Sequence, residues 1–251
     1  MTASSLVEGG NVPVCELTTA ERPAALRQIK LDAGGTSNVK AIHMSWHKDR
    51  GRGYHHGNLR EALIKAALDL IGSKGTGGFT FAEAARHAGV SPAAPYRHYE
   101  NREALLADVA TQGYAAFGEA MDKARAAPAG NEIDRLKAMG RAYLSFARDN
   151  PAYYSAMFES GLNFSDYAEL RKAADATFNG LRTAVEAVTA AMPADRKPPA
   201  MMVALHIWAI SHGVASLFGR GDGAAFKQPL SPEELLESHM LIYLDGLGAR
   251  G

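Results

Sequence analysis

Two short helical segments joined by a tight turn constrain this chain more than any other feature of its sequence. They occupy residues 80–99, with the sequence TFAEAARHAGVSPAAPYRHY. Thr80 and Glu83 have the T-x-x-E spacing of a capping box, which predicts that a helix begins there. Gly89 suits the positive-φ position that ends this helix, and Ser91 followed by Pro predicts the start of a second one. The spacing is that of a helix-turn-helix, whose second helix places its N-terminal residues against base edges in the DNA major groove.

Positive charge is concentrated around this motif, although the chain as a whole is neutral. The 251 residues hold 27 basic and 27 acidic side chains. Residues 44–100 hold eight basic and five acidic side chains, whereas residues 101–251 hold 15 basic and 18 acidic ones. Because a phosphate-facing surface needs a local excess of positive charge, this distribution favours nucleic acid as the partner of the motif.

Apolar residues recur at helical spacing from residue 59 onward, and no alternating run rich in Val, Ile or Thr predicts a strand. The apolar stripes and the Gly and Pro residues between them place helices at 59–74, 80–88, 91–99, 102–126, 133–147, 151–159, 170–188, 200–218 and 232–244. We therefore predict an all-α fold of about nine helices. It comprises an N-terminal three-helix domain with the helix-turn-helix and a C-terminal helical domain.

Residues 1–53 differ in composition from the rest of the chain. They contain few large apolar residues and little periodicity, so we predict a disordered tail with a basic end and a weak helix at Arg22–Leu31. Met44 directly precedes the first basic cluster, which makes it a candidate initiator, with residues 1–43 untranslated. N-terminal sequencing of the native protein tests this hypothesis, and a peptide from before Met44 would refute it.

Several functional classes find no support in the sequence. Cys15 is the single cysteine, which excludes an internal disulfide and suits a reducing cytoplasm. We see neither a secretory signal nor a run of about 18 apolar residues, so we expect no membrane span. We see no nucleophile elbow, Walker loop, H-E-x-x-H helix or paired-cysteine motif, so we predict neither an enzyme nor a bound cofactor. His55 and His56 lack further ligands at metal-binding spacing, so we predict no metal site.

Residues 57–117 resemble the DNA-binding domain of the tetracycline-repressor (TetR/AcrR) family of bacterial transcriptional regulators. The resemblance rests on five segments in register: Gly78-Phe79-Thr80-Phe81, Ala84-Ala85, Ala88-Gly89-Val90-Ser91, Tyr96-Arg97-His98-Tyr99 and Asn101-Arg102-Glu103-Ala104-Leu105. The family usually has Phe in place of Tyr99 and Lys in place of Arg102, and both changes keep shape or charge. Pro95 lies near the fourth position of the expected recognition helix, where it removes one N–H bond without breaking the helix.

A second resemblance covers the C-terminal half of the chain. The run Trp208-Ala-Ile-Ser-His212-Gly213 resembles the W-x-x-x-H-G motif of one class of TetR-family C-terminal domain, and the opening run of residues 54–60, YHHGNLR, is similar to that class. The resemblance implies that residues 118–251 form a ligand-binding and dimerisation domain.

The resemblance also implies a set of DNA contacts. Small residues at the start of the recognition helix approach the bases, Arg97 contacts guanine or phosphate, and Arg102 anchors the backbone beside the groove. A flexible arm with Arg50, Arg52, His55 and His56 reaches the adjacent phosphates or the minor groove. From the residues alone, Arg97 is equally a solvated surface residue, and Tyr99 is a core residue. The residues expected to touch DNA are Thr80, Ser91, Ala93, Ala94, Tyr96, Arg97, His98 and Arg102.

For the C-terminal domain the resemblance implies a ligand pocket among the middle helices and a dimer interface on the last two. The candidate pocket residues are Tyr143, Tyr153, Met157, Phe158, Phe178, Leu181, Trp208 and His212. The helices Ala200–Phe218 and Pro232–Leu244 would dimerise through Met201, Leu205, Trp208, Met240, Tyr243 and Leu247. A plainer interpretation, which we prefer for Trp208 and His212, is that they pack in the core or at a subunit interface, with His212 bonded to a neighbour.

The predicted function is therefore that of a cytoplasmic, homodimeric repressor. It would bind a palindromic operator in double-stranded DNA and leave it when a small hydrophobic molecule binds. An activator or co-regulator would use the same residues, because the sign of regulation depends on the operator's position. A helical enzyme is the other alternative, and turnover of a ligand would favour it.

Overall fold

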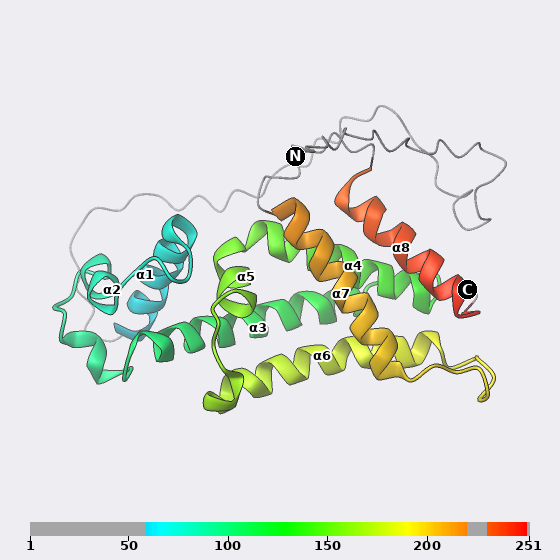
Figure 1. Ribbon diagram of the computed structural model, residues 1–251, viewed down its shortest axis with the longest axis horizontal. Helices are drawn as coiled ribbons and strands as arrows, with labels where there is room; N and C mark the ends of the chain where they lie inside the picture. Colours follow the sequence, from blue (N-terminus) through cyan, green and yellow to red (C-terminus); the bar gives the residue numbers. More distant parts are fainter. Residues whose placement is uncertain (1–58, 220–229, 250–251) are drawn as a thin grey trace, which may run out of the picture. The chain divides into compact units, whose positions relative to one another are not determined.

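The computed structural model describes residues 59–219 and 230–249, and within these ranges the chain is all-α, as predicted (Figure 1). The predicted helix at Arg22–Leu31, the candidate initiator Met44 and the basic arm lie outside the described residues. The described part holds eight α-helices and two 3-10 helices. In chain order they are α1 (Leu59–Lys74), α2 (Phe81–His87), η2 (Ala94–Arg97), α3 (Arg102–Ala126), α4 (Glu132–Asp149), α5 (Pro151–Phe158), η3 (Phe164–Asp166), α6 (Ala168–Val188), α7 (Ala200–Gly219) and α8 (Pro232–Gly246).

The predicted capping box at the start of α2 is present. The hydroxyl of Thr80 accepts a 3.2 Å hydrogen bond from the Glu83 backbone N–H, and the Glu83 carboxylate accepts a 2.8 Å bond from the Thr80 N–H. The α2 helix ends at His87 with Ala88 as its C-cap, and Gly89 follows with φ of 74°. A residue with a Cβ rarely adopts a positive φ of this size, so glycine is the residue suited to the turn.

The recognition segment differs from the prediction. Instead of an α-helix beginning at Ser91, the chain forms a turn and then the short 3-10 helix η2, whose cap residue Ala93 makes no side-chain capping bond. Pro95 lacks the N–H that would donate to the Ser91 carbonyl in a regular helix, whereas Pro92 stands at a position where no intrahelical bond is made. Tighter bonds form instead, such as the 3.0 Å bond from the Ala94 N–H to the Ser91 carbonyl. The assumption that Pro95 leaves the α-helix intact was wrong.

The long helix α3 connects the helix-turn-helix to the C-terminal helices, because it packs against α1 at its beginning and against α4, α5 and α6 further along (Figure 1). Its buried stripe includes Leu105, Val109 and Phe117, as the helical spacing predicts. Gly113 allows α5 to approach closely. A Cβ at this position would lie only 2.8 Å from the Met157 sulfur. The position of α5 is therefore tightly linked to that of α3.

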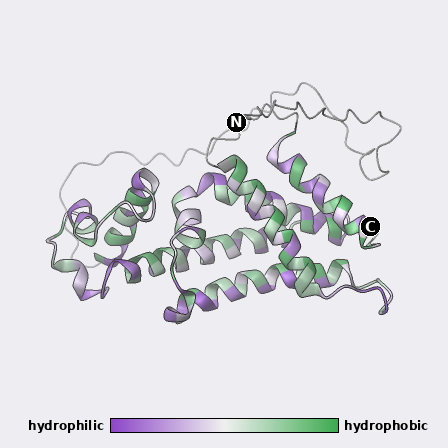
Figure 2. Ribbon diagram, viewed as in Figure 1, coloured by the Kyte–Doolittle hydropathy of each residue, from purple (hydrophilic) through white to green (hydrophobic). Residues whose placement is uncertain are grey.

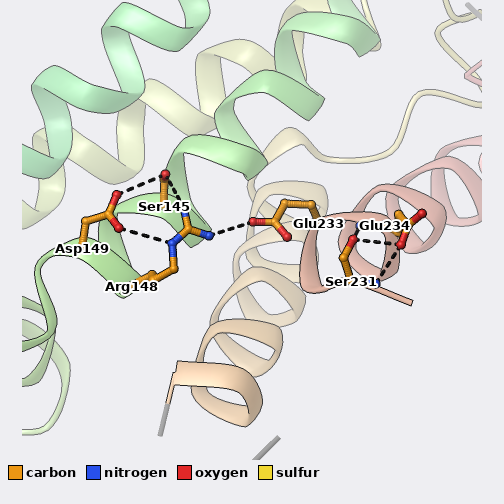
Figure 3. Close-up of polar contacts among 6 residues, drawn as sticks. All are labelled: Ser145, Arg148, Asp149, Ser231, Glu233 and Glu234. Carbon is orange, nitrogen blue, oxygen red and sulfur yellow. Dashed lines mark hydrogen bonds and ion pairs between the residues drawn. The ribbon is translucent and has the colours of Figure 1, made fainter. Parts of the chain in front are cut away.

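Apolar packing and ion pairs together hold α8 against α4. A Cβ at Gly140 would lie 2.9 Å from the Met240 methyl group, so the two helices approach closely there. About two turns beyond the close approach, the Arg148 guanidinium donates to the Glu233 carboxylate at 3.1 Å and to the Ser145 hydroxyl at 2.9 Å (Figure 3). These contacts fix which face of α8 points inward.

The most apolar described helix is α7, which Figure 2 shows as hydrophobic along much of its length. By length and composition it is the one described helix apolar enough to cross a membrane, over Ala200–Phe218, which the sequence analysis did not anticipate. A helix that packs against neighbours on several sides has the same composition. Within this chain only 33% of that stretch is buried, so much of its apolar surface lacks a partner in the described residues.

Candidate nucleic-acid interface and internal cavity

The recognition segment presents small and polar side chains to solvent. Ser91, Ala93, Tyr96, Arg97 and His98 are exposed, whereas Ala94 is half-buried. The Tyr96 ring is 64% exposed and makes an edge contact with Phe81 of α2, with ring centroids 5.0 Å apart. The predicted contact residues of this segment thus lie together on an accessible surface, apart from Ala94, and their contact with DNA stays a prediction.

A polar cluster of Tyr99, Asp108 and Arg60 holds the end of this segment on α3 and α1. Tyr99 is 7% exposed, which confirms its assignment to the core, and its hydroxyl donates a 2.5 Å hydrogen bond to Asp108. Arg60 donates two further hydrogen bonds of 2.7 Å to the same carboxylate. These contacts raise the pKa of Arg60, and burial raises the pKa of Tyr99, so both groups stay protonated.

Arg102 points into the protein rather than outward. Its guanidinium donates to the Thr76 carbonyl, forms a 3.0 Å bond with Glu103 and lies 4.9 Å from the Phe79 ring centroid. Its side chain is only 22% exposed. In this conformation the guanidinium holds the loop before α2. The resemblance did not show this role, and the contact of Arg102 with a phosphate stays a prediction.

A cavity of about 240 Å³ lies among α3, α4, α5, α6 and α7. Five of the predicted pocket residues line it: Tyr143, Phe158, Phe178, Leu181 and Trp208. Tyr153 and Met157 do not, because they face α3 at Gly113. The lining residues that sequence reasoning missed are Tyr114, Phe117, Met121, Phe164, Ala174, Asp175 and Thr177. Phe117 was predicted only as part of a buried stripe. Thr177 is a polar residue within the apolar stripe of α6, and this is a signal that could have indicated the α6 side of the cavity.

His212 lies behind the cavity wall, where it joins three helices. Its Nδ1 is 3.0 Å from the Tyr143 hydroxyl and 2.8 Å from the Tyr154 hydroxyl, and its ring stacks on that of Tyr154. Burial lowers the pKa of His212, so the neutral ring accepts from a tyrosine hydroxyl. The interpretation of His212 as a residue bonded to its neighbours is confirmed.

Two helices display an apolar surface with no partner among the described residues. The large exposed apolar side chains of α7 and α8 are Met201, Met202, Leu205, Trp208, Leu217 and Ile242. Met240 was predicted to belong to this surface, but it is 1% exposed because it packs against Gly140. Tyr243 and Leu247 are half-buried, and the Tyr243 hydroxyl lies 2.7 Å from His206 Nδ1.

One hydrogen bond connects the end of the cavity wall to the helix-turn-helix. Phe158 lines the cavity and is the last residue of α5, and Glu159 follows it as the C-cap. The Glu159 carbonyl accepts a 3.1 Å hydrogen bond from the Thr76 hydroxyl in the loop before α2. The Thr76 carbonyl in turn accepts from Arg102 at the start of α3. The residue next to the cavity wall is therefore in direct polar contact with the recognition domain.

Both halves of the chain match families of known proteins. Residues 63–109 match the family described as bacterial regulatory proteins, tetR family, and residues 136–242 match the tetracyclin repressor-like C-terminal domain. The first match covers the helix-turn-helix, and the second covers most of the cavity lining and the Trp208–Gly213 motif. The chain belongs to the tetR family. It is a DNA-binding transcriptional regulator of that family.

Two curated HTH-type transcriptional regulators match over limited segments. The HTH-type transcriptional regulator BetI of Rhizobium meliloti (strain 1021) is 49% identical over 47 residues, which is 19% of this chain and 23% of that protein. The HTH-type transcriptional regulator YobS of Bacillus subtilis (strain 168) is 25% identical over 100 residues, or 40% of this chain and 51% of that protein. The matches thus span about a quarter and a half of these relatives.

A solved structure extends the likeness to most of the described chain. A protein of unknown function from Rhodococcus sp. RHA1 aligns with a TM-score of 0.65 and 26% identity, over 78% of this chain and 98% of that one. The tetR architecture of a helix-turn-helix followed by a larger helical domain is thus common to both proteins.

Proposed function

We propose that this regulator is a cytoplasmic, homodimeric repressor that binds a palindromic operator and leaves it when a small apolar molecule enters the cavity. It would act by binding alone, without turnover of the ligand. The observation that carries the proposal is the polar contact between Thr76 and Glu159, because it connects the cavity wall to the recognition domain.

Homodimerisation is supported by the surface of α7 and α8. Met201, Leu205 and Ile242 are 49%, 44% and 48% exposed, and contiguous apolar surface of this kind marks an interaction site. Gly213 on α7 has nothing within 4 Å of its Cβ position, so a helix of a second subunit has room to approach there. A two-fold symmetric dimer would present two recognition segments to the two halves of a palindrome.

Release by a ligand requires that the ligand bind the two conformations of the dimer with different affinity. A molecule in the cavity would press on Phe158 at the end of α5. The resulting displacement of α5 would be passed from Glu159 to Thr76. From Thr76 it would reach Arg102, which is the first residue of α3. A change in the direction of α3 alters the spacing of the two recognition segments. By linkage, operator DNA would lower the affinity for the ligand by the same factor.

The first test is operator binding by the purified full-length chain. Fluorescence anisotropy with the DNA upstream of its own gene, over a range of salt concentrations, should show tight binding to one fragment that resists competitor DNA. Footprinting should then show a palindromic site. Equal and weak binding to all fragments, followed by a random-sequence selection that enriches no palindrome, would contradict the proposal.

A further inference from the structure

The cavity adjoins a second hollow on the surface between α3 and α6. This groove has a volume of about 330 Å³ and shares three lining residues with the cavity, Tyr114, Met121 and Thr177. Its remaining lining residues are Ala115, Gly118, Glu119, Asp122, Met139, Ala173, Ala176 and Gly180. A molecule in the cavity therefore has a neighbouring surface for a polar end group.

The charged side chains that line these two hollows are all acidic. They are Asp175 in the cavity and Glu119 and Asp122 in the groove, and no Lys, Arg or His belongs to either lining within the described residues. Two of these carboxylates have a basic neighbour: Arg171 lies 3.8 Å from Asp175, and Arg125 donates to Asp122 at 3.2 Å. Both carboxylates are about two-thirds exposed, and ion pairs with that exposure are weak, so each remains able to meet another cation.

Aromatic rings make up most of the cavity wall. The seven are Tyr114, Phe117, Tyr143, Phe158, Phe164, Phe178 and Trp208. Burial raises the pKa of Tyr114 and Tyr143, so these two phenols stay uncharged. The faces of aromatic rings carry negative potential and attract organic cations, with Trp the strongest. The aromatic wall and the carboxylates therefore both favour a positively charged ligand.

We propose that the cavity binds a small organic cation, with an apolar body among the rings and an ammonium group toward Asp175 and Glu119. A volume of about 240 Å³ is below the usual range of about 300–1,000 Å³ for ligand pockets, which favours a small molecule. A carboxylate of the same size would meet like charges and no lining cation. The inference that a cation binds does not depend on the proposed function, whereas the role of that cation in regulation rests on the proposed function.

Three compounds with one body and different head groups test the charge preference. Phenylpropylamine, phenylpropanol and phenylpropionate are, at pH 7, a cation, a neutral molecule and an anion. Calorimetric titration into the full-length chain, repeated with homologues of longer linkers, should give the tightest binding for the amines. We expect an advantage of at least about fivefold over the carboxylates.

Variants of the carboxylates test whether these side chains cause the preference. The double variant Glu119→Gln, Asp175→Asn keeps the shape of both side chains and should weaken the amine about three- to fivefold while leaving the alcohol unchanged. Glu169→Gln is the matched control, because Glu169 is exposed on the same helix as Asp175 and lines neither hollow. It should leave all three affinities unchanged.

The outcomes separate this inference from the proposed function. Tightest binding by the carboxylates, equal effects of the double variant on all three compounds, or no binding by any homologue would overturn the cationic ligand. If carboxylates bind best and release the operator in the anisotropy assay, the charge class is wrong and ligand release stands. If the chain binds no operator, the repressor proposal fails, and the titrations still decide the charge class.

Discussion

The hydroxyl of Tyr99 and the carboxylate of Asp108 are 2.5 Å apart, and this contact fixes the end of the recognition segment on α3. Because η2 is short and has no side-chain cap, it depends on such tertiary contacts for its position. Arg60 of α1 binds the same carboxylate through two hydrogen bonds. One aspartate therefore connects the first helix, the recognition segment and the helix that leads to the cavity.

Removal of this contact should destabilise the protein and weaken operator binding. Tyr99→Phe removes the donor but keeps the ring in the core, and we expect a loss of about 1–2 kcal/mol in the free energy of unfolding, measured by urea denaturation. Asp108→Ala should cost more, because it leaves the buried Tyr99 hydroxyl without an acceptor. Tyr96→Phe is the control for stability, since Tyr96 is exposed in the same segment. Equal stability of Tyr99→Phe and Tyr96→Phe would show that the bond has no structural role.

Arg97 is the exposed cation of the recognition segment, and its removal should weaken DNA binding without a change in fold. We expect Arg97→Ala to reduce operator affinity about tenfold. A contact to phosphate would lower the salt slope of binding by about one, whereas a contact to guanine would relax specificity at one base pair. Lys172→Ala on α6 is the control, because Lys172 is an exposed cation in the C-terminal domain. Undiminished affinity of Arg97→Ala in anisotropy would refute its role.

The Thr76–Glu159 contact predicts coupling that can be measured without a ligand. Gly113→Ala places a methyl group 2.8 Å from the Met157 sulfur and 3.2 Å from the Tyr153 ring, so it pushes α5 away from α3. We expect it to lower operator affinity several-fold. Thr76→Val keeps the shape of the side chain and removes the donor to Glu159, so in that background the effect of Gly113→Ala should shrink.

A second valine variant serves as the control for this cycle. Thr111→Val also removes a hydroxyl, but that hydroxyl bonds only to the Ala107 carbonyl of its own helix. It should leave the effect of Gly113→Ala unchanged. If Gly113→Ala has the same effect in the wild-type and Thr76→Val backgrounds, or has no effect on operator binding at all, the path through Thr76 is contradicted.

The apolar surface of α7 predicts the position of the dimer interface. Leu205→Arg introduces a charge where we expect a second subunit, and it should convert the dimer to monomers at micromolar concentration in sedimentation velocity experiments. Operator affinity should fall as the dimer dissociates, because a monomer binds one half-site. Ala116→Arg on an exposed face of α3 is the control and should leave the mass unchanged. A Leu205→Arg protein with the same mass as the wild type would place the interface elsewhere.

The sequence predicted the fold well where local signals determine structure. The capping boxes at Thr80 and Ser231 mark the beginnings of α2 and α8, and the Asn101 side chain caps α3. The prediction of an α-helical recognition segment failed at Pro95, because a missing N–H there changes the hydrogen-bond pattern. Capping and backbone donors are local properties, so a sequence reading has access to them.

The site depended on how the helices pack, which a single sequence does not determine. Tyr114 and Thr177 come from α3 and α6, and only the contact between those helices brings them to one cavity. The α8 helix is apolar on more than one face, so its sequence did not reveal that Met240 points to Gly140 while Ile242 stays exposed. The bond between Arg102 and the Thr76 carbonyl was also not foreseen, because that carbonyl belongs to a loop distant in the sequence.

The lowered pKa of His212 predicts a pH-dependent stability. The neutral form is favoured in the folded protein because burial penalises the charged ring, so the unfolded state binds more protons as the pH falls below the ordinary value of 6.5. The free energy of unfolding should therefore decrease on acidification, and we expect a decrease below about 1 kcal/mol between pH 7 and pH 5.5 from this residue. Glu159 opposes the effect, since its charge raises the pKa of the ring.

His212→Asn keeps an acceptor for the tyrosine hydroxyls and removes the titrating group, so urea denaturation should show a shallower pH dependence than in the wild type. His239 also has a pKa lowered by burial, so His239→Asn provides a second profile in which the contribution of His212 persists. An unchanged pH profile in His212→Asn would show that the ring does not lose its proton on folding.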